Sequence, residues 1–220
     1  MDIKSLISER TKKYYCDLSV LDVGKELFEL ISKISFPFVA RTVMFDTNHF
    51  IKTEESFSSS LTRKFGNEIK RLNKIDFSDV NNRIECYIGH IKDVLRMNFE
   101  LIDQAFEHTV VETLGILLSN INDLDFSENK FKDSFHTDNC YKDLKFFLKY
   151  KNIPFEIQFH NYISEKMNLA THGIYEVARE TNNKSISDKI FADKYKLYEM
   201  VNSPEFSINQ IIEEVDKRHA

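Results

Sequence analysis

Residues 154–160 read PFEIQFH, and this stretch decides the fold class. Apolar and polar side chains alternate along it: Phe155, Ile157 and Phe159 on one side, and Glu156, Gln158 and His160 on the other. Alternation with a period of two is typical of a β-strand that has one apolar face and one polar face. The sequence therefore predicts a strand whose polar face carries an acid, an amide and an imidazole in a row.

Three earlier stretches, 96–101, 126–135 and 141–150, alternate in the same way and are predicted strands. Their polar positions are Arg96, Asn98 and Glu100, then Glu128, Lys130 and Lys132, then Asp143, Lys145 and Lys149. A solvated sheet face, common in antiparallel sheets, accounts for this pattern, and so does a face that binds a charged ligand. Both readings stay open on periodicity alone.

Helical spacing of apolar residues surrounds these strands, and one short extended run lies near the start of the chain. The predicted helices cover 2–34, 56–73, 79–92, 102–121 and 164–180, with two more after residue 185, and the extended run follows Pro37 and covers 38–45. This order predicts an α+β fold, in which helices pack on a mixed, largely antiparallel sheet of four to five strands. We expect a helical extension at 1–35, a central domain at 36–180 and a second helical extension at 181–220.

Composition and charge narrow the class of protein. A chain of 220 residues is long enough for one domain with extensions, and its net charge of −5 argues against a general nucleic-acid binder. Three widely spaced cysteines predict reduced thiols. We find no standard signal peptide and no apolar run long enough to cross a membrane, which predicts a cytoplasmic protein with no membrane partner. Secretion as an effector stays open.

The polar strand faces suit phosphate chemistry. Lysine and arginine bind phosphate oxygens, and carboxylates bind Mg²⁺ together with substrate phosphates. The sequence has no glycine-rich phosphate loop of either common kind. Side chains must therefore supply most of the contacts to any bound phosphate.

Five motifs, which follow one another along the chain in the same order as in the family, resemble the synthetase domain of the RelA/SpoT family of alarmone synthetases. The family's glutamate strand, E-[IV]-Q-[IVF], matches residues 156–159, and its N-G-Y opening of the preceding strand matches 139–141. Its aspartate, apolar run and arginine match IKDVLRM, and its S-x-x-R-K helix matches 60–64. Its AAHW-Y-K helix is similar to ATHGIYE at 170–176. ARTV, DVLR and QFH place the chain nearest to the small toxin-like and phage-associated branch.

The resemblance implies a nucleotidyltransferase-like synthetase fold and a Mg²⁺-dependent transfer of pyrophosphate from ATP to the 3′-hydroxyl of a purine nucleotide. It implies that Asp93 holds Mg²⁺, and that Glu156 binds Mg²⁺ or activates the hydroxyl. Residues near the ATP phosphates would be Ser60, Arg63 and Lys64. The acceptor would contact Tyr141, which stacks on its base, and Arg96, Gln158, His160, Lys145 and Asn139.

The chain departs from the family pattern at several of these positions. Family members are basic where this chain has Glu54 and Ser56. His160 replaces an arginine, as in the toxin-like branch, Lys145 replaces a histidine, and Cys140 replaces a glycine. Arg96 follows Asp93 by three residues instead of five, which keeps it on the same strand face.

Three functions therefore stay open: an active pyrophosphokinase with Arg41 or Lys52 in place of the missing cations, a degenerate module that binds nucleotide or a protein partner, and a related enzyme acting on tRNA 3′ ends. The predicted partners are ATP and a purine nucleotide, with an antitoxin, a host protein and a homo-oligomer left open.

Overall fold

The computed structural model describes residues 3–37, 39–43, 50–69, 77–101, 106–133 and 143–161, with four isolated positions, Val177, Lys189, Ala192 and Lys196. Everything below refers to these residues. None of their helices is both long enough and apolar enough to cross a membrane.

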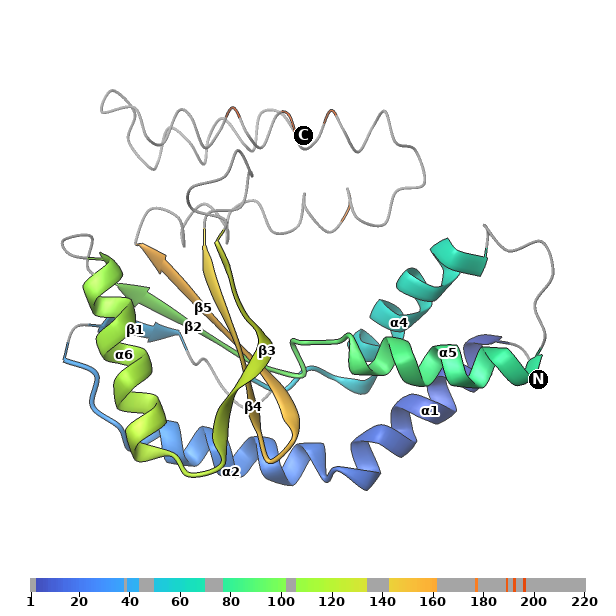
Figure 1. The fold of residues 1–220 in the computed structure, drawn as a ribbon, viewed down its shortest axis with the longest axis horizontal. Coiled ribbons are helices and arrows are strands. Elements are labelled where there is room, and N and C mark those ends of the chain that lie inside the picture. The colour runs from blue at the N-terminus through green and yellow to red at the C-terminus, as the bar shows by residue number, and fades with distance from the viewer. Residues whose placement is uncertain are drawn as a thin grey trace.

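A five-stranded mixed sheet forms the centre of the fold (Figure 1). Its strands are β1 (Val39–Val43), β2 (Leu95–Leu101), β3 (Leu124–Asp133), β4 (Leu144–Tyr150) and β5 (Ile153–Asn161). They lie in the order β1-β2-β5-β4-β3, and only the β2–β5 pair is parallel. The predicted α+β fold with a mixed, largely antiparallel sheet is confirmed.

Two helices precede the sheet where the sequence predicted a single run over 2–34. They are α1 (Ile3–Asp17) and α2 (Val20–Ser32). The helix is interrupted between them at Leu18 and Ser19, where Ser19 adopts a left-handed conformation with φ of 46°. The helical character predicted for 2–34 is confirmed in both halves, and the break at Ser19 is a feature that the sequence did not predict.

Gly24 lies inside α2 because another segment approaches the helix closely there. A Cβ atom at this position would lie 2.6 Å from Ile51 Cδ1 and 3.1 Å from Leu95 Cδ2. The glycine costs helix propensity but lets α2 pack directly on β2. The sequence indicated a weak point in a helix, and the structure gives it a packing role.

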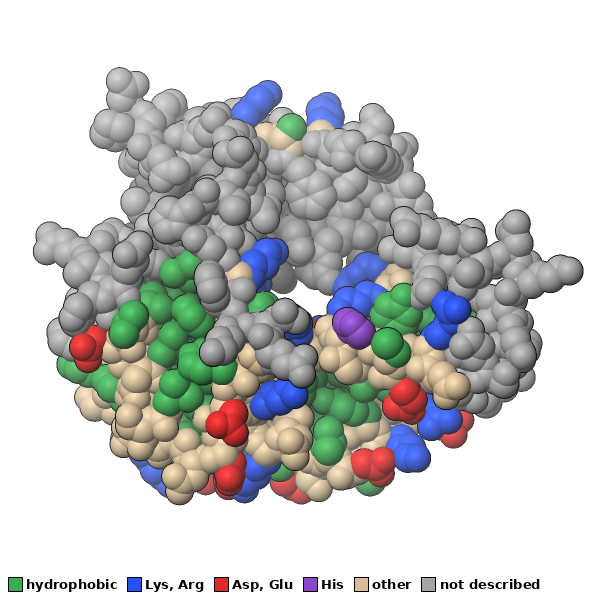
Figure 2. All heavy atoms as spheres, in the orientation of Figure 1, with side chains coloured by type: hydrophobic (Ala, Val, Ile, Leu, Met, Phe, Trp, Pro, Cys, Tyr) green, Lys and Arg blue, Asp and Glu red, His purple; other side chains and the backbone are tan. Residues whose placement is uncertain are grey.

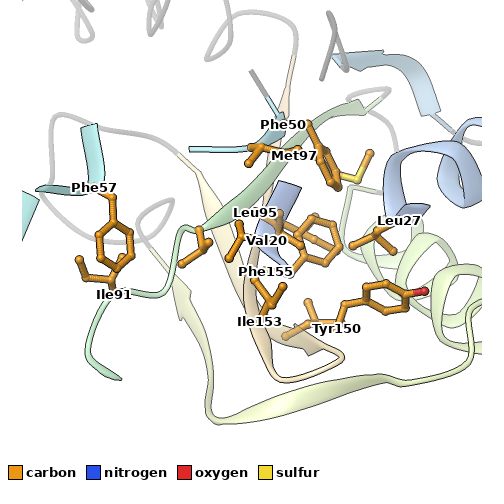
Figure 3. Close-up of a cluster of buried hydrophobic side chains, with 14 of the residues drawn as sticks. Val20, Leu27, Phe50, Phe57, Ile91, Leu95, Met97, Tyr150, Ile153 and Phe155 are labelled. Atoms are coloured by element: carbon orange, nitrogen blue, oxygen red, sulfur yellow. The ribbon is translucent and has the colours of Figure 1, made fainter. Parts of the chain in front are cut away.

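The apolar face of the sheet is buried, and its side chains belong to one continuous core (Figure 3). Leu95, Phe155 and Ile153 are fully buried there, next to Val20 and Leu27 of α2. Helix α6 (Phe106–Asn120) contributes Val110, Leu114 and Leu117 to the same core. Each strand residue on this face stabilises the fold by roughly 1.5–3 kcal/mol through burial.

A second group of helices lies to one side of the sheet: α1, α4 (Glu54–Ile69) and α5 (Phe77–Gly89) (Figure 1). Phe57 of α4 stacks on Tyr14 of α1, with ring centroids 5.2 Å apart, and meets the edge of Tyr15 at 5.5 Å. The segment 90–94 leaves α5 and leads into β2. This segment therefore connects the helical group to the sheet. Residue 52, which comes just before α4, lies at the same junction, because its N–H bonds to Val94.

Candidate active site

Asp93 lies at the junction between the helical group and the sheet, two residues before β2 begins. Its Oδ2 atom is 2.8 Å from Lys52 Nζ, and the two side chains form an ion pair. The side chain of Lys52 is 5% exposed, whereas that of Asp93 is 34% exposed. The lysine therefore supports the carboxylate from the protein interior, and the carboxylate keeps an open edge.

Backbone contacts bring these two residues together. Ile51 forms an antiparallel bridge with Leu95, and the Lys52 N–H donates to the Val94 carbonyl at 2.8 Å. The hydroxyl of Tyr15 donates to the Lys52 carbonyl. Lys52 is thus tied to α1 on one side and to the Asp93 loop on the other.

Basic side chains surround Asp93. Burial raises the pKa of Asp93, but Lys52 and Arg96 outweigh this effect and hold the pKa below its ordinary value. The carboxylate is therefore ionised at neutral pH. Desolvation lowers the pKa of Lys64, with Lys52, Arg63 and Lys92 acting in the same direction and Asp93 opposing them. A carboxylate and five cations thus interact at this junction.

Helix α4 supplies part of this cluster. Ser60, Arg63 and Lys64 are spaced by three and four residues, which places them on one face of the helix. Ser60 is buried, Arg63 is half-buried and Lys64 is exposed, with Lys64 Nζ 3.4 Å from the His90 carbonyl oxygen. The three residues that the sequence assigned to the ATP phosphates therefore share a helix face near Asp93.

The acidic start of α4 has a local structural cause. Glu54 and Glu55 occupy the first turn, where negative charge stabilises the positive end of the helix dipole. Thr53 precedes this turn, and its Oγ1 accepts a hydrogen bond from the Ser56 N–H at 3.2 Å. Thr53 thus caps α4, and Glu54 and Glu55 stabilise the same end of the helix.

The parallel register of β2 and β5 places two predicted site residues side by side. Arg96 pairs with Glu156, Asn98 with Gln158 and Glu100 with His160. In this register Glu156 lies three residues beyond the level of Asp93, an offset of about 10 Å for extended backbone. Arg96 therefore lies beside Glu156, three residues along the chain from Asp93, and a metal shared by the two carboxylates stays a prediction.

Glu156 has a second basic partner on β4. Its Oε1 atom accepts hydrogen bonds from Gln158 Nε2 and from Lys145 Nζ, the latter at 3.3 Å. Lys145 Nζ is also 3.2 Å from Asp143 Oδ2, so one ammonium is shared by two carboxylates. Burial lowers the pKa of Lys145, but Glu156 and Asp143 outweigh it and raise the pKa above its ordinary value.

Asp143 is the most deeply buried member of this cluster, with a side chain that is 0% exposed. Burial raises its pKa from 3.8 to about 6, and Lys145 opposes this shift. The sequence placed Asp143 on a polar strand face but gave it no role. Its missing signal is depth, because alternation along a strand says which face a residue occupies and not how far that face is covered.

The polar face of the sheet is not uniformly solvated. Lys132 and Lys149 are exposed near β3 and β4, but Glu100, Glu156 and His160 are 6%, 8% and 1% exposed. Buried ionisable groups on neighbouring strands are expensive unless they are paired or functional. The alternative of an ordinary solvated face is therefore wrong for the β2–β5 part of the sheet.

One aromatic residue interrupts this face. Phe147 pairs with Glu156 in the β4–β5 register and is buried, and Lys92 Nζ lies 4.6 Å from its ring centroid. Sequence reasoning missed both residues, since Phe147 reads as one more apolar strand residue and Lys92 as a loop charge. Figure 2 shows a hollow near the middle of the face it draws, with basic side chains and a histidine beside it.

The donor groups fit a Mg²⁺ ion that arrives together with phosphates. Mg²⁺ typically binds one or two protein carboxylates and completes its shell with water and substrate phosphate oxygens. Asp93 is ionised and partly open, as this mode requires. Among the residues that the structure describes, no group of three or more His, Cys, Asp or Glu side chains gathers to hold a metal alone.

Two predicted acceptor residues, Asn139 and Tyr141, lie outside the described residues, as do Cys140, His172 and Tyr175. The structure does bring Ser60, Arg63, Lys64, Asp93 and Arg96 to one junction, and it places Glu156, Gln158, His160 and Lys145 on adjoining strands.

No model of a known protein family matches this sequence, and no curated protein is significantly similar to it. Among solved structures, the small alarmone synthetase 2 from Bacillus subtilis aligns with a TM-score of 0.49 and 15% identity, over 92% of this chain and 98% of that one. A GTP pyrophosphokinase family protein from Streptococcus pneumoniae aligns with a TM-score of 0.48 and 14% identity, over 93% and 91%.

The small alarmone synthetase 1 from Bacillus subtilis, bound to its product pppGpp, aligns with a TM-score of 0.44 and 11% identity, over 96% of this chain and 90% of that one. These proteins are of the family that the sequence motifs resemble. At such low identities and TM-scores the likeness carries no argument about activity or substrate, and both have to be argued from the side chains of this chain.

Proposed function

We propose that this chain is a Mg²⁺-dependent pyrophosphokinase that transfers the pyrophosphoryl group of ATP to the 3′-hydroxyl of a purine nucleotide. One observation carries the proposal: Lys52, Arg63, Lys64 and Lys92 gather with Asp93 at one junction, and the buried carboxylate of Glu156 lies beside Arg96 on the adjoining strands. The first part suits a triphosphate and the second suits a hydroxyl group. The sequence motifs supply the class of nucleotide.

The triphosphate would bind at the helix–sheet junction. Arg63 and Lys64 on α4 and Arg96 on β2 would neutralise its oxygens, with Ser60 donating from the same helix face. Lys92, and the positive charge of the buried Lys52, would compensate for the cations that are missing at positions 54 and 56. Phosphoryl transfer depends mainly on positioning and charge stabilisation, so a convergent set of cations is the main requirement.

Glu156 would act as the general base. The 3′-oxygen attacks the β-phosphorus of ATP, the bond from that phosphorus to the oxygen bridging the α-phosphorus breaks, and AMP leaves. The hydroxyl proton passes to a Glu156 oxygen. Gln158 and Lys145 orient this carboxylate through their hydrogen bonds.

Asp93 would hold Mg²⁺ against the phosphates, and the bound metal would neutralise charge that develops on the transferred group. Tyr141 would stack on the acceptor base, with Asn139, Gln158, His160 and Lys145 contacting the rest of the acceptor. These acceptor roles rest on the resemblance, and Tyr141 and Asn139 are the first residues to test by substitution.

A nucleotide-binding module without catalysis is the second candidate. It is favoured by one observation: both carboxylates that the reaction needs already pair with lysines, Asp93 with Lys52 and Glu156 with Lys145. Such a module would bind ATP at the cationic junction and would transfer nothing. An antitoxin or host protein would then be its functional partner.

Incubation with Mg²⁺, ATP labelled at the γ-phosphate and a panel of GDP, GTP, ADP, ATP and tRNA distinguishes these functions. The proposed enzyme labels a purine nucleotide and releases AMP, and Glu156→Ala abolishes the product. Label on tRNA alone would identify the related transferase. Thermal stabilisation by ATP without any labelled acceptor would identify the binding module and refute the proposed reaction.

A further inference from the structure

Lys52 is the buried partner of the carboxylate to which the proposed function assigns the metal. Its ammonium lies 2.8 Å from Asp93 Oδ2, a distance typical of a strong charge-assisted hydrogen bond. The proposed reaction does not use this ion pair directly.

The position of Lys52 is held by its own backbone. Its N–H bonds to Val94, its carbonyl accepts the hydroxyl of Tyr15, and Tyr15 in turn packs against Phe57. The side chain is almost completely buried. Separating this ammonium from its anion would leave a buried charge without a partner, which costs much free energy. Lys52 therefore remains paired with Asp93 when no ligand is bound.

The charges around Asp93 oppose a free divalent cation. Lys52 and Arg96 act on Asp93 directly, and Lys64 interacts with Asp93, Arg63 and Lys92. Among the described residues these five cations face two carboxylates, Asp93 and the nearby Glu54. A bare Mg²⁺ ion meets a net positive field there, whereas a nucleotide polyphosphate meets an attractive one. Once the polyphosphate is bound, its negative charge reverses the field and the open edge of Asp93 becomes a favourable metal ligand.

We propose that Lys52 is a built-in counter-ion that prevents Asp93 from binding free Mg²⁺, so that the metal enters this site only together with a nucleotide polyphosphate. This inference rests on the proposed function, which assigns the metal to Asp93. Lys52 is a positioning residue in this scheme: it holds one carboxylate oxygen and leaves the other edge of the carboxylate to the phosphate-bound metal.

Binding of Mn²⁺, followed by the loss of its free electron paramagnetic resonance signal, tests the proposal without any catalytic readout. Nucleotide-free wild type should bind Mn²⁺ weakly, and Lys52→Met should bind it at least about tenfold more tightly, since it removes one unit charge in contact with the ligand. Lys52→Arg keeps the charge and should resemble wild type. Lys12→Met removes an exposed charge on α1 and should also resemble wild type.

A non-hydrolysable ATP analogue with a methylene bridge between its α- and β-phosphates completes the test. Wild type should bind Mn²⁺ at least about tenfold more tightly when the analogue is present. The analogue should increase the Mn²⁺ affinity of Lys52→Met much less. Lys52→Gln serves as a second uncharged variant, and thermal melting shows that each variant is folded.

Equal Mn²⁺ affinity of nucleotide-free wild type and both uncharged variants would overturn the proposal, as would wild type that binds Mn²⁺ equally well with and without the analogue. Failure of the proposed function gives a different result. No acceptor is then labelled, while the titrations without nucleotide still separate wild type from Lys52→Met and support the counter-ion role.

Discussion

Glu156→Gln separates the chemical role of this side chain from its structural role. The substitution keeps the size of the side chain and removes its charge. Lys145 is not left without an anion, because its Nζ remains 3.2 Å from Asp143 Oδ2. We therefore expect the free energy of unfolding to fall by about 1.5–3 kcal/mol, the range for losing a hydrogen bond to a charged group, and not by the ~3–5 kcal/mol of an orphaned buried charge.

The effect on the reaction should be much larger. A positioned general base typically contributes about 10²–10⁴-fold to the rate, which corresponds to roughly 3–5 kcal/mol of barrier. The assay measures labelled product per enzyme per minute at saturating ATP, beside urea unfolding of the same preparation. Glu156→Asp keeps the charge and should retain more activity than Glu156→Gln.

Lys149→Gln is the matched control, because Lys149 is exposed and lies on the same face of β4 as Lys145, the partner of Glu156. It should change neither the rate nor the stability appreciably. Turnover by folded Glu156→Gln within about threefold of wild type would refute the reasoning, since an amide cannot accept the hydroxyl proton.

Three further predictions concern stability. Burial raises the pKa of Asp143 to about 6, so native protein keeps a proton that unfolded protein loses as the pH rises from 4 to 6, and stability falls across this window. Asp143→Asn should therefore exceed wild type by about 1–3 kcal/mol at pH 7 and match it near pH 4 in urea unfolding; an unchanged difference at the two pH values would contradict this. Gly24→Ala should lower the melting temperature by about 2–4 °C, because its Cβ meets Ile51. Gly115→Ala, whose Cβ would have nothing within 4 Å, should raise the melting temperature. A shift of the melting temperature in the same direction for both would show that α2 yields at this contact. Phe155→Ala should cost about 3–5 kcal/mol in urea unfolding because its ring is fully buried, and a loss below 1 kcal/mol would mean that the core can close around the gap.

Local patterns predicted most elements because each depends on neighbouring residues. The period of two at 154–160 gave β5, and the spacing of Ser60, Arg63 and Lys64 gave one face of α4. The break at Ser19 escaped prediction, since a left-handed residue other than glycine leaves little trace in hydrophobic periodicity. Gly24 was noticed, but its close contact with Ile51 depends on residues 27 positions apart.

The candidate site was predicted in part for the same reason. Motif spacing found Asp93, Arg96 and Glu156, each of which lies within or just before a predicted strand. It proposed Lys52 only as one substitute for missing cations, and it gave Asp143 no role. Both residues acquire their meaning from burial and from a partner on another element.

The alternation of the strands, the helix faces and the net charge follow from the order of side chains along the chain. Which charges meet depends on how the chain folds. The parallel pairing of β2 with β5 sets Arg96 beside Glu156, and the bridge between Ile51 and Leu95 sets Lys52 on Asp93. Coulomb interactions fall with distance and grow with burial, and both quantities exist only in the folded chain.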